Sequence, residues 1–188
     1  MKIVQAQADV NVLGVNGSHN FLVLLGDNGQ ELGQLHGWQV KDGKVEVAGV
    51  GGNLQVRSDY TYNMNDLSID RGVLWEGDAA TGLVLWETAK DCGVAVNNIN
   101  YSYNFLDSFG GHNSNAAAYT LVECMDLNWI NLEGFSPGEG ELILDSSVIE
   151  YIQSQNPRPP KDNGPYNPAS LPQEDEVTIV GVHELVPC

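Results

Sequence analysis

The pattern of apolar and polar residues predicts β-structure in the first third of the chain. From residue 3 to residue 13, valine and alanine occupy almost every second position, which is the period of a strand with one buried face. Two shorter strand candidates, KVEVAGV and NLQVR, follow within residues 39–57. Gly51 and Gly52 lie between them and are expected to interrupt the strand, because glycine weakens the interior of a strand. We expect both candidates to extend the same sheet.

The segment between the first strand and these two candidates has the pattern of a β-hairpin. An apolar run at residues 21–25 is followed by the turn sequence DNG and then by a second run, in which Leu32 and Leu35 are expected to face inward. This hairpin places His19 near its beginning and His36 near its end.

Helical patterns follow a polar segment, residues 59–77, which has no clear period and is expected to be mostly loop. In DAATGLVLWETAKDCGVAV, Asp78 is suited to cap the first turn and apolar residues recur on one face. The stretch NAAAYTLVECMDL is the clearest helix, because it opens with three alanines. A short helix is also predicted at DSSVIEYIQ, with Asp145 or Ser146 as its cap.

Together the elements predict one α+β domain over residues 1–155, in which an antiparallel β-sheet packs against a few helices. Within it, INYSYNFLDSF is expected to form a strand or an extended arm. Residues 156–176 are rich in proline and predict a surface linker or arm. The last run, within residues 177–188, predicts a strand that returns to the same domain.

Composition and charge narrow the range of partners. The 188 residues are 42% hydrophobic and 18% charged, which suits a single globular core. Acidic residues outnumber basic ones by 25 to 8, for a net charge of −17. Such a chain has no basic cluster to neutralise phosphates, so nucleic acid is excluded as a partner. A basic protein surface is compatible with this charge, although most acidic surfaces are simply solvated.

Neither a secretory signal pattern nor a run of 18 apolar residues occurs in the sequence, so no stable membrane insertion is expected. The three cysteines, Cys92, Cys124 and Cys188, are widely scattered and match neither a disulfide framework nor a zinc site. This predicts a reducing compartment: cytoplasmic in the producing cell, with export by a non-classical route as an alternative. No cofactor and no metal are expected, because the chain lacks a phosphate-cradling glycine loop and a calcium loop.

Candidate chemistry lies at Ser114, in the turn GGHNSNAAAYTLVE at the start of the clearest helix. The unpaired N–H groups of a helix start favour negative charge, so they help a nucleophile there and can hold the oxyanion that it forms. His19, on a neighbouring strand, is placed to accept the proton of the nucleophile, and a further polar residue would orient that histidine.

The order of these residues resembles the circularly permuted papain-like hydrolases, which include NlpC-type peptidases, lecithin:retinol acyltransferase-like proteins and PPPDE-like peptidases. The similarity covers residues 17–125. It implies that His19 is the base and His36 the third member, as in the acyltransferase-like branch. It also implies that Ser114 is the nucleophile, with Asn113, Asn115 and Asn20 supporting the oxyanion or the substrate. The implied activity is hydrolysis or acyl transfer at an amide or ester of a peptide, a cell-wall peptide or an acyl lipid, as in bacterial effectors and toxins.

One position departs from the family, because Ser114 stands where those proteins carry cysteine. A natural serine nucleophile, a cysteine replaced by serine and a pseudoenzyme all explain it. Ser114 alone also fits an ordinary N-cap, and His19 and His36 alone fit ordinary strand residues. His112 is a weaker candidate base, because residues so close along a turn usually point apart. The alternative function is a non-catalytic module that binds a partner.

Overall fold

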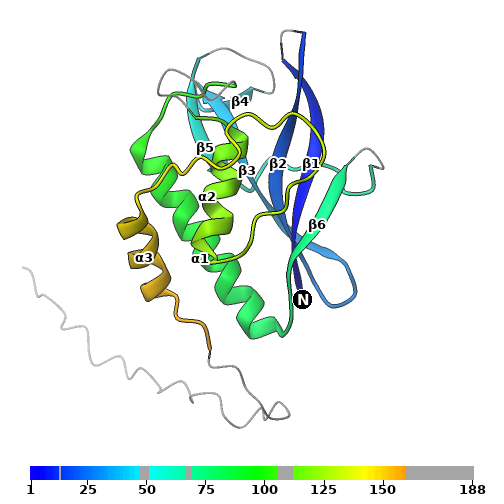
Figure 1. Ribbon diagram of the computed structural model, residues 1–188, viewed down its shortest axis with the longest axis vertical. Coiled ribbons are helices and arrows are strands. Elements are labelled where there is room, and N and C mark those ends of the chain that lie inside the picture. The colour runs from blue at the N-terminus through cyan, green and yellow to red at the C-terminus, as the bar shows by residue number, and fades with distance from the viewer. Residues whose placement is uncertain (13, 47–50, 67–68, 106–111, 160–188) are drawn as a thin grey trace, which may run out of the picture.

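The computed structural model describes residues 1–12, 14–46, 51–66, 69–105 and 112–159 (Figure 1). Within these residues the chain forms six strands and three helices. The strands are β1 (Lys2–Val12), β2 (Val15–Leu25), β3 (Glu31–Lys41), β4 (Lys44–Glu46), β5 (Asn53–Arg57) and β6 (Asp70–Glu76). The helices are α1 (Ala79–Ile99), α2 (Ser114–Cys124) and α3 (Ser146–Gln155). All strand pairs are antiparallel, which confirms the expected α+β class.

The sheet has the order β4-β3-β2-β1-β6, and β5 joins it by pairing with β3. β2 pairs with β3 from Phe21 to Leu25. From His36 to Val40, β3 pairs with β5 instead. Strands β2 and β3 therefore part at His36, and the beginning of β2 has no partner among the described strands on its β3 side.

Side chains alternate between the two faces of this sheet, and each face carries its own apolar cluster. Figure 1 shows the three helices gathered on one face, with the loop after α2 crossing toward β1 and β6. The cluster under the helices joins strand residues to α1 and α2: Ile3, Leu22, Leu24, Leu35, Leu54, Leu85, Ala89, Ala117 and Leu121. The opposite face carries the second cluster: Val4, Ala6, Ala8, Phe21, Val23 and Ile69.

The first strand, the hairpin and the strand NLQVR are confirmed, and the described part of KVEVAGV forms β4; two other expectations are corrected. Leu35 is buried as expected, but Leu32 next to the turn is 50% exposed. Residues 70–76, expected to be loop, form β6, which pairs with the edge of β1. Most of its residues remain at least partly exposed, so this edge strand lacks the apolar alternation by which strands are found in a sequence.

The three predicted helices are confirmed. Asp78 caps α1, because its side chain accepts a hydrogen bond of 2.8 Å from the N–H of Thr81. Asp145 is the N-cap of α3, although its side chain makes no capping bond. Of the expected strand or arm after α1, the described part forms two isolated bridges, Asn53 with Ser102 and Tyr103 with His112. The predicted C-terminal strand and residues 160–176 of the proline-rich arm lie outside the described residues.

The prediction for the cysteines was wrong, because Cys92 and Cys124 form a disulfide. They stand 32 residues apart in the sequence, and the packing of α1 against α2 brings their Cα atoms to 6.6 Å. The pairing depends on this helix contact, which cysteine spacing does not reveal. Cys188 lies outside the described residues.

No helix in the described part of the chain has the length and the apolar character needed to cross a membrane.

Candidate active site

The candidate site lies where β2 and β3 part and the first turn of α2 meets the unpaired edge of β2. There the side chain of Asn115 bonds the β2 backbone groups that have no partner among the described strands. Its side-chain oxygen accepts a bond of 2.9 Å from the backbone N–H of Asn20, and its Nδ2 donates to the carbonyl of Ser18 at 3.0 Å. These two β2 residues flank His19, so the bonds fix the start of α2 beside that histidine.

A glycine on β3 allows this close approach. A Cβ atom at Gly37 would lie 2.9 Å from the Cα of Ser114 and 2.6 Å from the Cβ of Ala117. Real Cβ atoms do not tolerate such contacts, so the helix could not occupy this position over any other residue. Gly37 stands between His36 and Trp38, which brings Ser114 against the same part of β3 that carries His36.

Asn113 holds the first turn of α2 in shape. It is the N-cap, and its side-chain oxygen accepts bonds from the N–H groups of Asn115 at 2.8 Å and Ala116 at 3.1 Å. Its Nδ2 donates to the carbonyls of Phe105 at 2.8 Å and Pro137 at 2.7 Å. α2 therefore begins with Ser114 as its first helical residue, and Ser114 itself is not the cap.

His19 and His36 form a hydrogen-bonded pair whose donor directions follow from Gln34. Its amide pairs with the backbone of Tyr62, donating through Nε2 at 2.8 Å and accepting through Oε1 at 2.9 Å. The same Oε1 lies 2.6 Å from Nε2 of His36, so that nitrogen carries a proton and donates it. Nδ1 of a neutral His36 must then accept, and it does so from Nε2 of His19 at 2.9 Å. Nδ1 of His19 is left with its lone pair.

Aromatic rings surround the histidine pair. Trp38 stacks on His19 with ring centroids 4.5 Å apart, and Phe21 stacks on His36 at 4.3 Å. His19 and His36 are 3% and 0% exposed, respectively. Burial lowers the pKa of His19 to about 3, and burial together with His19 lowers the pKa of His36 to about 2. Both rings are therefore neutral at physiological pH.

The nucleophile candidate and the histidine pair approach β2 and β3 from different sides. By strand alternation, His19 and His36 project with Phe21 to the face opposite the helices, whereas α2 arrives from the helix face. They meet at the place where the two strands part. Among the described residues no hydrogen bond joins His19 to Ser114, and Ser114 is 4% exposed.

Tyr103 is a neighbour of Ser114 that sequence reasoning missed. Its bridge to His112 brings it beside the start of α2. Burial raises the pKa of the Tyr103 phenol, and hydrogen bonds from the hydroxyl and the backbone N–H of Ser114 partly offset this effect. The alternation of tyrosines in INYSYNF predicted an extended segment, but it carried no signal for a contact with a serine eleven positions later.

The loop after α2, which we call the strap (residues 130–137), covers this region and is held mainly by its backbone. Gln5 donates to the carbonyl of Ile130 at 2.9 Å and accepts from its N–H at 3.1 Å. The N–H of Ser18 donates to the carbonyl of Phe135 at 2.9 Å. Nδ2 of Asn113 and Nδ2 of Asn115 both donate to the carbonyl of Pro137, at 2.7 and 3.0 Å.

The structure thus brings the six predicted residues to one place in two groups. Ser114, Asn113, Asn115 and Asn20 form the group at the start of α2, and His19 with His36 forms the buried pair. The three asparagine side chains are engaged by partners within the chain, including a bond of 3.2 Å from Asn20 to Ser136. In the described residues no group of three or more His, Cys, Asp or Glu side chains is placed to hold a metal ion.

Comparison of the chain with protein-family models, with curated proteins and with solved structures finds no match.

Proposed function

We propose that the protein is a hydrolase or acyl-transfer enzyme of the permuted papain-like type, acting on an amide or ester with Ser114 as nucleophile. One observation carries this proposal. Nε2 of His19 donates to His36, so its Nδ1 is free to accept a proton, and His19 lies between the two β2 residues that bind Asn115. A neutral base with a fixed tautomer close to a helix start supports the proposal, and acylation further requires that Oγ of Ser114 come within hydrogen-bonding reach of Nδ1 of His19.

Acylation of Ser114 in the proposed reaction has two proton transfers. Nδ1 of His19 takes the proton of the Ser114 hydroxyl while Oγ attacks the carbonyl carbon of the substrate. The carbonyl oxygen becomes an oxyanion. As it re-forms the carbonyl, the bond from the carbonyl carbon to the leaving amine or alcohol breaks, His19 gives its proton to that group, and an acyl ester remains on Ser114. Water or an acceptor alcohol completes the cycle by the reverse route. His36 accepts from Nε2 of His19 throughout and stabilises the ring orientation.

The oxyanion donors differ from those that the sequence suggested. Asn113 already occupies the N–H groups of Asn115 and Ala116, and Asn115 bonds β2. The other groups next to Oγ are the hydroxyl of Tyr103 and the backbone N–H of Ser114, which donates to that phenol until a substrate oxygen takes its place. We therefore assign oxyanion support to these two donors, and the three asparagines become positioning residues.

The test is labelling with a fluorophosphonate probe, which reacts with activated serines. We expect labelling of the wild type at Ser114, identified by peptide mapping, and its loss in Ser114→Ala and His19→Gln. Ser146→Ala is the matched control, because Ser146 is likewise the first residue of a helix after an N-cap, but its helix α3 packs against α1 and α2 and does not begin beside His19. Equal labelling of the wild type and Ser114→Ala would contradict the proposal. Activity that appears only in Ser114→Cys would indicate a site suited to a thiol.

A second candidate, a binding module for a basic protein, is favoured by the charge of residues 91–157, which contain no lysine or arginine. In the part of this stretch that the structure describes, six acidic residues are exposed: Asp91, Asp126, Glu133, Glu141, Asp145 and Glu150. An oligolysine peptide is a suitable probe. Binding should weaken more when Glu141, Asp145 and Glu150 are changed to lysine than when Asp9, Glu31 and Asp70 are changed, although the net charge shifts equally.

A further inference from the structure

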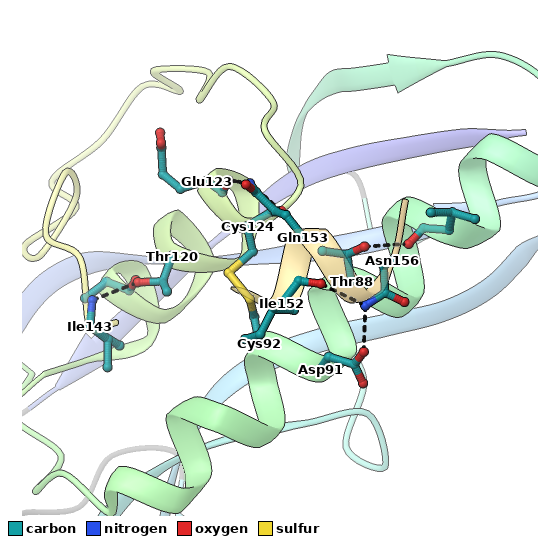
Figure 2. Close-up of a disulfide and its surroundings, with 12 residues drawn as sticks. Thr88, Asp91, Cys92, Thr120, Glu123, Cys124, Ile143, Ile152, Gln153 and Asn156 are labelled. Carbon is teal, nitrogen blue, oxygen red and sulfur yellow. Dashed lines mark hydrogen bonds between the residues drawn. A yellow bond between two sulfur atoms is a disulfide. The ribbon is translucent and has the colours of Figure 1, made fainter. Parts of the chain in front are cut away.

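The cysteine pair in the helix layer lies apart from the proposed chemistry. Cys92 belongs to α1 and Cys124 is the last residue of α2, and a disulfide joins them. Figure 2 shows the bond between the two helices, with Ile152 and Gln153 of α3 beside it. Both cysteines are 0% exposed. The bond is therefore part of the interior.

Helix α3 closes over the disulfide. Nε2 of Gln153 donates to the carbonyls of Glu123 and Cys124 at 3.2 and 3.0 Å, which are the last carbonyls of α2. Nδ2 of Asn156 donates to Oδ2 of Asp91, next to Cys92, at 2.8 Å. These bonds fix α3 to the neighbours of both cysteines, as Figure 2 shows. A reductant has access to the sulfur atoms only when α3 moves, because thiol–disulfide exchange needs direct attack on sulfur.

Such a bond indicates where the protein matures. Disulfides form and persist in oxidising compartments, whereas glutathione and thioredoxin keep thiols reduced in the cytosol. Catalytic and sensing disulfides are accessible to their partners, and this one is covered. A buried disulfide that ties two helices together is therefore structural, and it needs an oxidising environment at the time of folding.

We propose that this domain acquires the Cys92–Cys124 disulfide in an oxidising compartment and acts outside the reducing cytosol. The oxidant is the disulfide of a thiol–disulfide oxidase. One cysteine thiolate attacks it and forms a mixed disulfide, and the second thiolate displaces the enzyme. The domain loses two electrons and two protons, and the oxidase leaves as a dithiol. Exchange precedes the docking of α3, because the docked helix covers both sulfur atoms.

The test counts thiols in the full-length chain carrying Cys188→Ser, so that Cys92 and Cys124 are the remaining cysteines. Protein from the cytosol of the producing cells and from the medium or envelope is quenched in acid and alkylated in denaturant, before and after reduction. We expect the protein outside the cytosol to take up no label before reduction and two labels after it. Newly made cytosolic protein should already carry two labels before reduction, which controls for oxidation during handling.

Two results would overturn the proposal. The first is protein that accumulates at its site of action with both thiols free. The second is equal rates of reduction by dithiothreitol for the folded oxidised protein and for the same protein in urea. We expect the folded protein to be reduced at least about tenfold more slowly, because α3 must open first. Equal rates would show an accessible bond that is open to cytosolic reductants.

Discussion

At the residue scale, Gln34 determines what the histidine pair can do. Its amide is oriented by two bonds to the backbone of Tyr62, and this orientation makes His36 a donor toward Gln34 and an acceptor toward His19. The chain of donors leaves the lone pair on Nδ1 of His19. Without Gln34, His36 could adopt the other tautomer, and the free nitrogen of His19 would carry a proton.

The first prediction concerns pH. The pKa values of His19 and His36 lie at about 3 and about 2 in the fold, below the ordinary value of 6.5. As pH falls below 6.5 the unfolded chain binds protons that the folded chain does not, so stability is complete above pH 6.5 and is lost toward pH 3. Urea unfolding should show a loss of about 2 kcal/mol per histidine between pH 7.5 and pH 5.

Variants separate this effect from other titrations. His36→Gln should lower by one the number of protons that the chain takes up on unfolding at acidic pH, and so reduce the pH slope of the unfolding free energy, even though it destabilises the fold. Phe21→Leu, in the same cluster but without a titrating group, should lower stability equally at all pH values. A pH slope that is identical in His36→Gln and the wild type would rule out the buried pair as its source.

The second prediction compares two neighbouring residues of α2. Asn115→Ala should lower the unfolding free energy by about 3 kcal/mol, because it leaves the buried N–H of Asn20 and the carbonyl of Ser18 unpaired. Ser114→Ala should cost about 1 kcal/mol or less, since only its contact with Tyr103 is lost. Urea denaturation of both variants measures the difference. A larger cost for Ser114→Ala would mean that Ser114 serves the fold more than the reaction.

The sequence identified the residues with recognisable chemistry but not their supports. Ser114 and His19 stand out because a helix start and a strand histidine are local patterns. Gln34 and Tyr103 do not, because their roles depend on contacts with Tyr62 and Ser114, residues separated by 28 and 11 positions. The three asparagines were recognised as polar neighbours of the site, but their capping and bridging bonds follow from the separation of β2 and β3.

At the element scale, the site depends on how closely α2 approaches β3. The third prediction is that Gly37→Ala lowers the unfolding free energy by about 2–3 kcal/mol, because the new methyl group meets the backbone of Ser114 and the side chain of Ala117. The displaced helix should also lose reactivity toward the fluorophosphonate probe. Both are measured on the purified variant.

Gly33 provides the control on the same strand. A Cβ atom there would meet Trp86 at 3.5 Å, an ordinary contact, so Gly33→Ala should change stability by no more than about 0.5 kcal/mol. If the two variants were equally stable, the close packing of α2 on β3 would not be a requirement of the fold.

Elements with strong periodicity were predictable, and those stabilised by distant partners were not. β1, the hairpin and α2 carry apolar repeats that each segment shows by itself. β6 is a strand because β1 offers it a free edge, and its exposed pattern gives no local sign of this. The same limitation applies to the disulfide, which requires that α1 and α2 pack together.

At the scale of the whole molecule, net charge and the disulfide have opposite effects on the stability of the folded state. The net charge of −17 on 188 residues destabilises the compact state, because like charges repel one another there. A disulfide that closes a loop of 32 residues disfavours the unfolded chain and needs no charge to do so.

The fourth prediction measures the contribution of the crosslink. Chain-entropy estimates for a loop of this length give about 3–4 kcal/mol, and for a domain of this size that corresponds to a melting temperature about 10 °C higher in the oxidised protein than in the reduced one. Calorimetry with and without dithiothreitol, in the Cys188→Ser background, compares the two states with identical side chains. The double variant Cys92→Ala with Cys124→Ala should melt at or below the reduced form, because it also loses the packing of two buried sulfur atoms. If oxidised and reduced protein melted together, the bond would add nothing to stability, and the reason to keep it buried between three helices would have to lie in packing alone.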